Sequence, residues 1–548
     1  MPYFSDLEEK IHFMILEANR QLDDTLKLIQ DPQPSRVDKV RSRDDRIDNY
    51  KAIIENMCFS RIHGKETLSK QQVDFIRAVN IISTNLERIS DFAVNIVGQL
   101  SYLSRVDFLQ GYNYQPFFQQ ISSSLDMVVQ GLFNRDLNLA LGICKAEFMV
   151  DKLFKRCFDQ IIEELDSGED KHDLITSLFI FRYLERMGDA VLNIGEAIIF
   201  SVFGEKLKIH QYQALMENLD SISTDISIHE VGFESIWESR SGCRIGKILE
   251  PSQRSGQAVL FKEGKVQKIS REKENIETWQ SIFPNLVPRI FSYTQSQDHA
   301  SMLLEFLPGC SIQEAILARD RETLENALFL IQETMSLVWN KTTRPEPANA
   351  GFVSQLKQRL DDVLTIHPEF NFSQANIGSL TTLSLDRIME ILTEIENELQ
   401  AEFSAFIHGD FNTNNIIYNP RDQQIYFIDL HRSCYGDYIQ DVAVFLVSNY
   451  RKPVFETQVR EIIHWLNQEF FAFAQGFARE KKDKTFHARL ALGLVRSFLT
   501  STRFELNQEF AQSMYHRALY LAEKLISHRG KPWEEFSITQ DVFRYSTF

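Results

Sequence analysis

Clustered basic residues are missing from this 548-residue sequence, in which 59 Lys and Arg stand against 76 Asp and Glu and the formal net charge is −17. Proteins that bind nucleic acid neutralise backbone phosphates with grouped basic side chains, so nucleic acid is not an expected partner. The six cysteines are scattered and form no C-x-x-C pair, which argues against a zinc site and against a disulfide framework. We therefore expect them to be reduced thiols.

Long apolar runs are also missing. Every apolar stretch, including "DAVLNIGEAIIFSVF" (189–203), is interrupted by charged or amide residues and is too short to span a bilayer. The first turns of the N-terminal helical pattern contain acidic residues, and no basic segment precedes an apolar one as in a signal peptide. The sequence therefore predicts a cytoplasmic protein that is not integral to a membrane.

The chain is long enough for two or three domains, because single hydrophobic cores stop growing at about 250–300 residues. Residues 1–205 show helical periodicity almost throughout, whereas short β-rich runs begin beyond "DSISTDISIHE" (220–230) and are followed by further helices. This change predicts a helical domain over 1–205, a linker over 206–228, an α+β domain over 229–530 and a C-terminal tail over 531–548.

The helical half repeats itself. The segments "NLERISDFAVNIVGQL" (85–100) and "YLERMGDAVLNIGEAI" (183–198) share Leu, Glu, Arg, Asp, Asn and Ile at the same places. Such a repeat indicates a duplicated unit, with copies over about 1–105 and 106–205. Apolar residues recur in each segment at steps of three and four, as in a helix that packs in a bundle. They are Leu86, Ile89, Ala93, Ile96 and Leu100, and Leu184, Met187, Val191, Ile194 and Ile198.

Acidic residues accompany each apolar seam in pairs four positions apart. Such residues share one helical face at roughly 5–6 Å between Cβ atoms, and their repulsion weakens an isolated helix unless a cation offsets it. Two pairs on neighbouring helices of a three-helix bundle could form an oxygen-rich metal site, and a solvated acidic face is the alternative. The pairs are Asp44 and Asp48, Glu87 and Asp91, Glu147 and Asp151, and Glu185 and Asp189.

At these residues the sequence resembles the PhoU family, regulators of phosphate uptake that contain two similar three-helix bundles. The resemblance extends over about 1–205 and is carried by the duplication and the paired acidic motifs. It implies metal clusters of Fe, Zn, Mn or Mg on the bundle surface, held by the acidic pairs, and a role in phosphate signalling or transport control. The segment "AEFMVD" (146–151) departs from the pattern, with Glu in place of a second Asp.

In the second half, "FSAFIHGDFNTNNIIYNPRDQQIYFIDL" (403–430) has the pattern of a strand, a polar loop and a hairpin that ends in Asp429. Phosphoryl transfer from ATP needs a carboxylate beside the attacking hydroxyl, and oxygen ligands that hold Mg²⁺ against the β- and γ-phosphates. Asp410 is the candidate catalytic carboxylate. Asn415 and Asp429 are the candidate Mg²⁺ ligands, because a hairpin brings both strand ends to the same side.

These residues resemble the aminoglycoside phosphotransferase superfamily, whose members have the bilobal protein-kinase fold and phosphorylate hydroxyl groups of small molecules. The resemblance covers about 228–530 and implies ATP and Mg as cofactors, with an N-lobe over about 229–307 and a C-lobe over about 308–530. The predicted fold is thus an all-α PhoU-like double three-helix bundle followed by an α+β kinase-like domain.

The same resemblance implies roles for residues of the N-lobe. Lys268, in the predicted strand "KVQKIS" (265–270), would bind the donor phosphates, with Glu274 as its ion-pair partner and Glu277 as the fallback. Backbone groups of Glu305 and Leu307 would meet the adenine edge. The turn that covers the phosphates should be "EPSQRSG" (250–256), which has a single glycine and no G-x-G-x-x-G motif.

Farther along, "CYGDYIQDVAVFL" (434–446) resembles the superfamily's G-D-x-x-x-D-x-A segment. The resemblance implies that Asp441 braces the catalytic loop and that Asp437 caps a helix. His408 is expected to orient Asp410. Two departures favour a small molecule over a protein substrate: "DLHR" (429–432) stands where protein kinases have D-F-G, and no A-P-E-closed segment follows before Asp441.

The sequence therefore predicts an ATP- and Mg²⁺-dependent phosphotransferase acting on an alcohol group of a small molecule, coupled to a metal-binding PhoU-like module linked to phosphate regulation. The alternative, favoured by the glycine-poor turn, is a non-catalytic nucleotide-binding regulator of phosphate uptake. Expected partners are ATP, the acceptor and phosphate-signalling or transporter proteins. The identity of the acceptor and the oligomeric state, a homodimer included, are left open.

Overall fold

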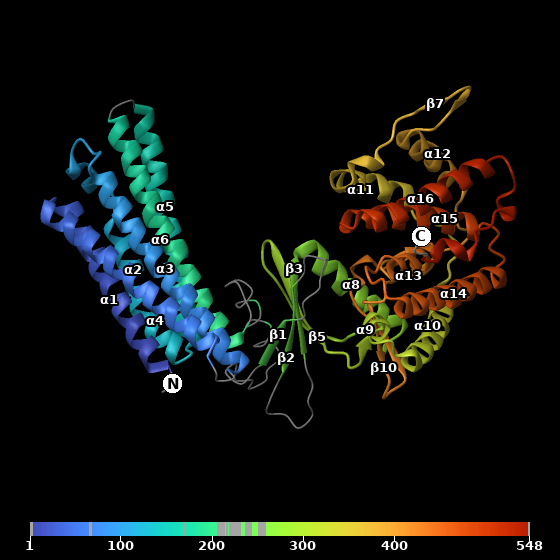
Figure 1. The fold of residues 1–548 in the computed structure, drawn as a ribbon, viewed down its shortest axis with the longest axis horizontal. Helices are drawn as coiled ribbons and strands as arrows, with labels where there is room; N and C mark the ends of the chain where they lie inside the picture. Colours follow the sequence, from blue (N-terminus) through green and yellow to red (C-terminus); the bar gives the residue numbers. More distant parts are fainter. Residues whose placement is uncertain are drawn as a thin grey trace. The chain divides into compact units, whose positions relative to one another are not determined.

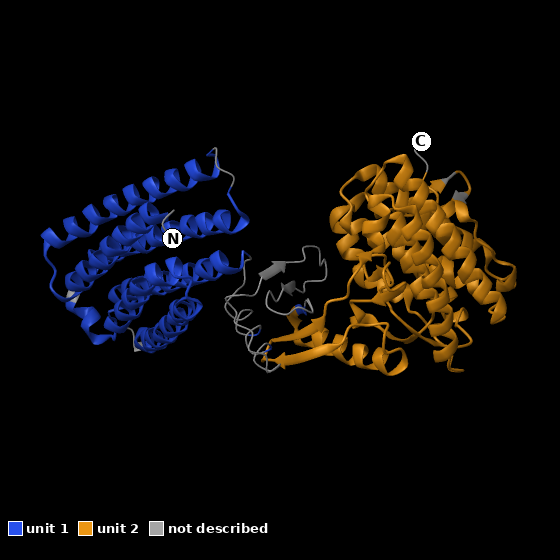
Figure 2. Ribbon diagram, turned by 90° about the horizontal axis from the view of Figure 1, so that it is seen from below, with its two compact units in different colours: residues 1–261 blue, residues 262–548 orange. Residues whose placement is uncertain are grey.

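The computed structural model describes residues 4–64, 68–167, 170–204, 214, 218, 232–235, 244–249 and 259–545. The chain divides into two compact units, residues 1–261 and 262–548 (Figure 2). The predicted phosphate-covering turn, 250–256, and all but two residues of the predicted linker, 206–228, lie outside the described residues.

Unit 1 is a helical bundle in its described N-terminal part (Figure 1). In each half of the bundle three helices pack against one another, which matches the predicted duplication. The short helix η2 (Val106–Gly111) lies between the halves, and the pair β1 (Gly232–Ser235) and β2 (Arg244–Leu249) follows as an antiparallel ribbon. The helices are α1 (Ser5–Gln30), α2 (Pro34–Ile62), α3 (Lys70–Leu100), α4 (Gln115–Phe133), α5 (Leu137–Ser167) and α6 (Lys171–Phe203).

The two repeated segments lie on α3 and α6, which pack side by side at the centre of the bundle. All ten predicted seam residues are buried, with exposed fractions of 6% or less. Asn193 on α6 donates from Nδ2 to Oδ1 of Asn85 on α3 at 3.3 Å, and the rings of Phe92 and Tyr183 stack at 6.1 Å. The helices that carry the repeated segments therefore join the two halves of the bundle.

Unit 2 begins with the strands of an N-lobe, in which β3 (Val259–Lys265), β5 (His299–Glu305) and β4 (Ile290–Gln295) lie in that order. The helix α8 (Val266–Ile282) follows β3 directly. The predicted strand over 265–270 was therefore wrong. Ile269, Ile276 and Trp279 are buried along one face of this segment at helical spacing, and this longer periodic pattern outweighs the short β-rich run.

The C-lobe of unit 2 is mainly helical and carries short strands that position the polar loop. The strand β9 (Ala405–Ile407) precedes the loop, and the hairpin β10 (Ile416–Asn419) and β11 (Gln424–Phe427) follows it. β12 (Cys434–Gly436) pairs with β9, β6 (Cys310–Ser311) with β10, and β7 (Asn376–Ile377) with β8 (Leu380–Thr381). The helices are α9 (Ile312–Ala318), α10 (Arg321–Thr342), α11 (Phe352–Ile366), α12 (Leu385–Glu398), α13 (Ile439–Tyr450), α14 (Thr457–Glu480), α15 (Phe486–Ser501) and α16 (Gln508–His528).

The segment predicted as a C-terminal tail packs onto the C-lobe through its described residues. It contains the short helices η7 (Trp533–Glu535) and η8 (Gln540–Phe543), and it buries Phe536, Val542 and Phe543. Arg517 on α16 donates from Nε to the carbonyl oxygen of Val542 at 3.1 Å. Every helix among the described residues of the chain is too short or too polar to cross a bilayer.

Candidate active site

A buried lysine on β3 joins the N-lobe to the loop that follows β11. The Nζ atom of Lys262 donates to Glu272 on α8 at 2.6 Å and to Asp429 at 2.8 Å, and its side chain is 3% exposed. Burial alone would raise the pKa of Asp429, but Lys262 and His431 hold this pKa well below its usual range. The result is a desolvated cation between two carboxylates, the arrangement that grips donor phosphates in kinases.

The predicted lysine and its partner are elsewhere. Lys268 and Glu274 both lie on α8, where Glu274 and the fallback Glu277 are exposed and Glu277 pairs with Lys273 at 2.7 Å. The network therefore corrects the expected pair to Lys262 and Glu272. A lysine inside the apolar run "AVLFKEG" (258–264) is the signal that could have identified it, since charged residues are rarely fully buried unless paired.

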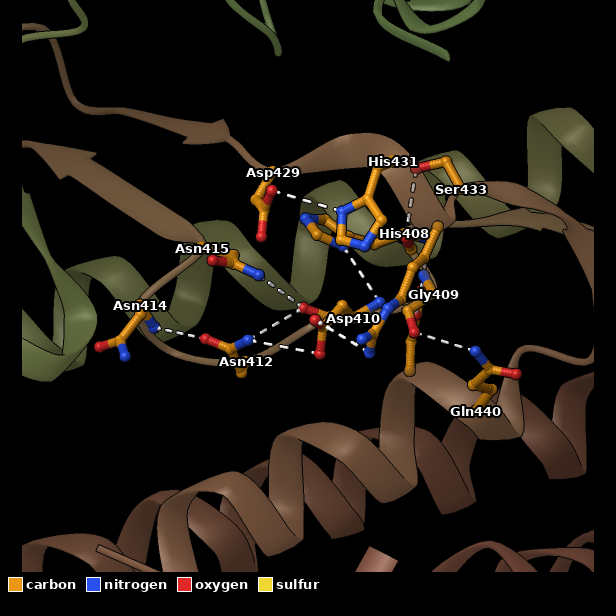
Figure 3. A network of polar contacts seen from close by, with 12 residues as sticks. His408, Gly409, Asp410, Asn412, Asn414, Asn415, Asp429, His431, Ser433 and Gln440 are labelled. Atoms are coloured by element: carbon orange, nitrogen blue, oxygen red, sulfur yellow. Dashed lines mark hydrogen bonds and ion pairs between the residues drawn. The ribbon is translucent and has the colours of Figure 1, made fainter. Parts of the chain in front are cut away.

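The polar loop is held by backbone contacts on both sides of Asp410 (Figure 3). The backbone N–H of Asp410 lies 3.3 Å from Nδ1 of His408, and Nε2 of the same ring lies 3.0 Å from the carbonyl oxygen of Ile428. Burial lowers the pKa of His408, so the neutral ring accepts at Nδ1 and donates at Nε2. His408 therefore orients the loop, as predicted.

Gly409 is the residue that lets the polar loop pass close to the backbone of Arg432. Its φ is +80°, a left-handed conformation, and an added Cβ would collide with the backbone carbonyl of Arg432. The close approach brings Nη1 of Arg432 to 3.2 Å from Oδ2 of half-buried Asp410. Arg432 is a site residue that the sequence pattern missed.

The hairpin brings the two candidate Mg²⁺ ligands together. The strands β10 and β11 are antiparallel, and the N–H of Ile428 donates to the carbonyl oxygen of Asn415 at 3.0 Å, so Asp429 follows directly opposite. Asn415 donates from Nδ2 to the carbonyl oxygen of Asp410 at 3.0 Å, which leaves its amide oxygen for another partner (Figure 3). These oxygens suit Mg²⁺, which prefers carboxylate and amide oxygen ligands.

The acidic pairs of unit 1 converge within each half of the bundle. Burial, and then Glu87, Asp44 and Asp48, raise the pKa of Asp91. In the second half, burial and then Asp151, Asp189 and Glu185 raise the pKa of Glu147 to about 7. Each helical pair therefore faces the pair on the neighbouring helix, as the three-helix arrangement predicts.

Basic side chains offset part of this acidity. Lys51 lies 3.1 Å from Glu87, and Arg182 lies 2.6 Å from Glu185. Within the described chain, the one group of three or more His, Cys, Asp or Glu with ligand atoms within 4.8 Å of one another consists of Glu272, Asp429 and His431. Metal binding by the acidic pairs therefore stays a prediction.

Comparisons with known proteins agree with this division of the chain. The PhoU domain family matches residues 11–100 and 117–198, and the phosphotransferase enzyme family (APH) matches residues 278–479. A PhoU homologue of Clostridium acetobutylicum, a phosphate-specific transport system accessory protein, is 27% identical over 222 residues, which are 38% of this chain and 96% of the relative. The chain joins a PhoU domain to a phosphotransferase domain.

Two further similarities concern one domain each. The homologue from Borreliella burgdorferi, which has the same description, is 29% identical over 197 residues, 34% of this chain and 87% of the relative. The structure of a Plasmodium vivax ethanolamine kinase covers 58% of this chain and 89% of its own, with 13% identity and a TM-score of 0.36.

Asp441 supports the polar loop of the phosphotransferase domain by accepting hydrogen bonds from its backbone. It is fully buried at the start of α13 and accepts from the backbone N–H groups of His408 at 2.9 Å and Gly409 at 2.8 Å. Asp437 accepts from the N–H of Ile439 at 3.0 Å and pairs with buried Arg489. Asp441 therefore braces the loop, as predicted. The prediction that Asp437 caps the helix was wrong, because Tyr438 is the N-cap of α13 and Asp437, one residue earlier, is held by its contact with Arg489.

The predicted adenine contacts lie where β5 leaves the N-lobe of the phosphotransferase domain. The N–H of Glu305 donates to the carbonyl oxygen of Arg289 at 2.9 Å, and Arg289 N–H in turn contacts the Glu305 carboxylate at 3.2 Å. The backbone of Glu305 and of half-buried Leu307 lies at this edge, and its contact with adenine stays a prediction.

Proposed function

We propose that the phosphotransferase domain transfers the γ-phosphoryl group of ATP to a hydroxyl group of a small molecule. The observation that carries this proposal is the buried contact of Lys262 with Glu272 and Asp429, one loop away from Asp410 and Asn415. A structural ion pair needs only two members. Phosphoryl transfer requires a cation that binds the donor phosphates, oxygen ligands for Mg²⁺ and a carboxylate beside the acceptor hydroxyl. All three kinds of group are present here.

Each residue has a role in this proposal. Lys262, oriented by Glu272, holds the donor phosphates, and Asn415 and Asp429 hold Mg²⁺. Mg-ATP, when bound, supplies the phosphoryl group and the charge neutralisation that its transfer needs. Asp410 orients the acceptor hydroxyl and takes its proton, while the neutral His408 and the buried Asp441 keep the loop in place.

We propose a regulatory role for the PhoU domain. Its relatives are named as accessory proteins of a phosphate-specific transport system, and its acidic residues converge in two places. A metal held there would make the domain responsive to metal or phosphate status. Phosphate-signalling or transporter proteins are the corresponding partners.

The catalytic assignment is tested with the full chain, Mg-ATP and a panel of hydroxylated metabolites. Asp410→Asn should lower the rate of product formation by about 10²–10⁴ while Mg-ATP affinity stays unchanged, because Asp410 acts on the acceptor. Asp422→Asn is the matched control: the same substitution at an exposed turn of the same hairpin, where Asn419 contacts Asp422 at 2.6 Å. Equal turnover in wild type and Asp410→Asn would contradict the assignment.

The second candidate function is a regulator that binds nucleotide without turning it over. The glycine-poor segment 250–256 favours it, since fewer backbone N–H groups could approach the phosphates closely. Tight Mg-ATP binding without turnover of any acceptor in the panel would support this candidate against the first.

A further inference from the structure

Asp410 contacts Arg432 and is an electrostatic neighbour of Arg359 and Arg496, and these residues belong to a group of five arginines in the C-lobe. Three of them come from elements that pack against one another, namely α11, α15 and η6 (Thr502–Phe504). Arg359, Arg432 and Arg451 are electrostatic neighbours of Arg496, and Arg359 and Arg432 are also neighbours of Arg503. Asp410 and Glu396 are acidic neighbours of Arg496.

Arg496 is buried without a hydrogen bond for much of its guanidinium group. It is 8% exposed, its Cζ lies 5.3 Å from the centre of the Phe352 ring, and its Nε and Nη2 atoms have no partner within the described chain. Nη1 of Arg503 is buried without a partner in the same way. Buried charged groups are costly unless paired, so these atoms are suited to an anionic partner.

The carboxylates around the cluster are already engaged. Both oxygens of Glu396 accept backbone N–H groups at the start of α11, from Phe352 at 2.5 Å and Val353 at 3.1 Å. Asp410 contacts Arg432, and Asp362, which is exposed, is an electrostatic neighbour of Arg359 and Arg503. The positive charge of the cluster therefore exceeds the negative charge that faces it.

A second buried arginine shows what a satisfied one looks like in the same domain. Arg489 is 2% exposed, and its two Nη atoms pair with Asp437 and Asp483. These carboxylates raise the pKa of Arg489 despite its burial, whereas burial and then Arg359 lower the pKa of Arg496 to about 9. Arg489 is a structural residue, and Arg496 lacks the partners that such a role would require.

We propose that Arg359, Arg432, Arg496 and Arg503 bind an anionic group of the acceptor, a phosphate or a carboxylate, and thereby place its hydroxyl beside Asp410. Guanidinium groups match both anions with paired hydrogen bonds. A cationic amino alcohol would instead face several like charges. The inference rests on the proposed function and narrows it: the acceptor is an anionic hydroxyl compound.

Binding of inorganic phosphate to the full chain, with Mg-ADP saturating the nucleotide site, is the first test. Arg496→Met and Arg503→Met should each weaken phosphate binding by about 10- to 100-fold, the loss expected for charge-assisted hydrogen bonds. Arg387→Met on α12 is the matched control, because Arg387 is exposed and pairs only with Glu390 on its own helix at 2.6 Å. Unchanged phosphate affinity in both cluster variants, or no measurable binding in wild type, would overturn the inference.

The thermal midpoint separates a binding role from a structural one. Met is similar in length to Arg and removes an unpaired charge, so the free Arg496→Met protein should unfold at the wild-type temperature or above it. A large drop in the midpoint of the free protein would show that Arg496 holds the fold through contacts within the chain, and would overturn the inference. Arg503→Met keeps the binding test independent, because Arg503 is only half-buried.

Turnover of four matched compounds distinguishes this inference from the proposed function. Glucose 6-phosphate and gluconate, which represent the phosphate and carboxylate arms, should be phosphorylated in preference to glucose and glucosamine. Preference for glucose or glucosamine would overturn the anionic acceptor and leave the kinase assignment intact. Phosphate binding that depends on Arg496, without turnover of any compound, would support the anion site and contradict the kinase assignment.

Discussion

Replacement of Lys262 by Met tests the central contact of the phosphotransferase domain. The substitution removes the cation that contacts Glu272 and Asp429 at 2.6 and 2.8 Å, and it keeps most of the side-chain volume. Glu272, 2% exposed at its side chain, then carries a buried carboxylate without its partner, and its Oε2 atom already lacks a hydrogen bond. Both stability and nucleotide binding should suffer.

The expected loss of stability follows from the burial of this pair. Removing one member of a buried ion pair costs about 3–5 kcal/mol. For a domain of this size, each kcal/mol shifts the midpoint of thermal unfolding by about 2–4 °C, so unit 2 should unfold roughly 6–20 °C earlier. Turnover should fall by about 10²–10³, the usual cost of removing one electrostatic stabiliser of the transition state.

The pH dependence of this loss has a definite sign. Because Lys262 and His431 hold the pKa of Asp429 below its usual range against its burial, the ion pair stabilises the fold above about pH 4 and less so as pH falls further. The difference in unfolding free energy between wild type and Lys262→Met should therefore narrow below pH 4. Urea unfolding at several pH values measures it.

Two further variants separate fold from function. The double variant Lys262→Met/Glu272→Leu removes both charges of the buried pair. Its thermal midpoint should therefore return toward that of the wild type, whereas its Mg-ATP affinity and turnover should stay low. Lys268 is half-exposed on α8, so Lys268→Met should leave the thermal midpoint and Mg-ATP affinity nearly unchanged. The reasoning is refuted if Lys268→Met loses nucleotide binding, or if the double variant regains wild-type turnover.

Three other predictions follow from the remaining contacts. Asp410→Asn should lower kcat by about 10²–10⁴ in an acceptor-phosphorylation assay and change the unfolding free energy by less than about 1 kcal/mol, because its ion pair with Arg432 is partly exposed. Asp441→Asn should loosen the loop, seen as faster amide exchange at His408 and Gly409. Since burial raises the pKa of Asp441 to about 7, wild type should also lose stability relative to this variant as pH rises from about 4 to 7. Alanine at Glu87, Asp91, Glu185 and Asp189 together should remove metal from the full chain, and equal metal content in both proteins would contradict the predicted ligands.

Local patterns in the sequence were enough to predict the helical half and the loop of the site. The seam residues, such as Leu86 and Leu184, recur at helical spacing, and that spacing decides which face of a helix is buried wherever it packs. The loop around Asp410 was predictable because its neighbours are close in sequence: a hairpin of antiparallel strands places Asn415 next to Asp429 through its own hydrogen bonds.

The N-lobe lysine could not be assigned in the same way. Two lysines, Lys262 and Lys268, stand in short β-rich runs, and the apolar neighbours of Lys262 are a weak signal that the packing was needed to decide. The segment after Lys265 buries Ile269, Ile276 and Trp279 along one face, so it forms a helix and turns Lys268 out of the sheet. Tertiary contacts thereby override a weak local preference.

Features that depend on neighbours along the chain could be predicted without the structure: the duplication, the acidic pairs and the order of Asp410, Asn415 and Asp429. The tertiary structure alone decided which cation meets Asp429 and that arginines from α11, η5 (Leu430–Arg432), α15 and η6 gather near Asp410. Lys262 and Asp429 are 167 residues apart, Arg359 and Arg503 are 144 residues apart, and no helical or strand period relates them. Electrostatic interactions depend on distance in space, so the charge of the acceptor site becomes visible only after the elements have packed.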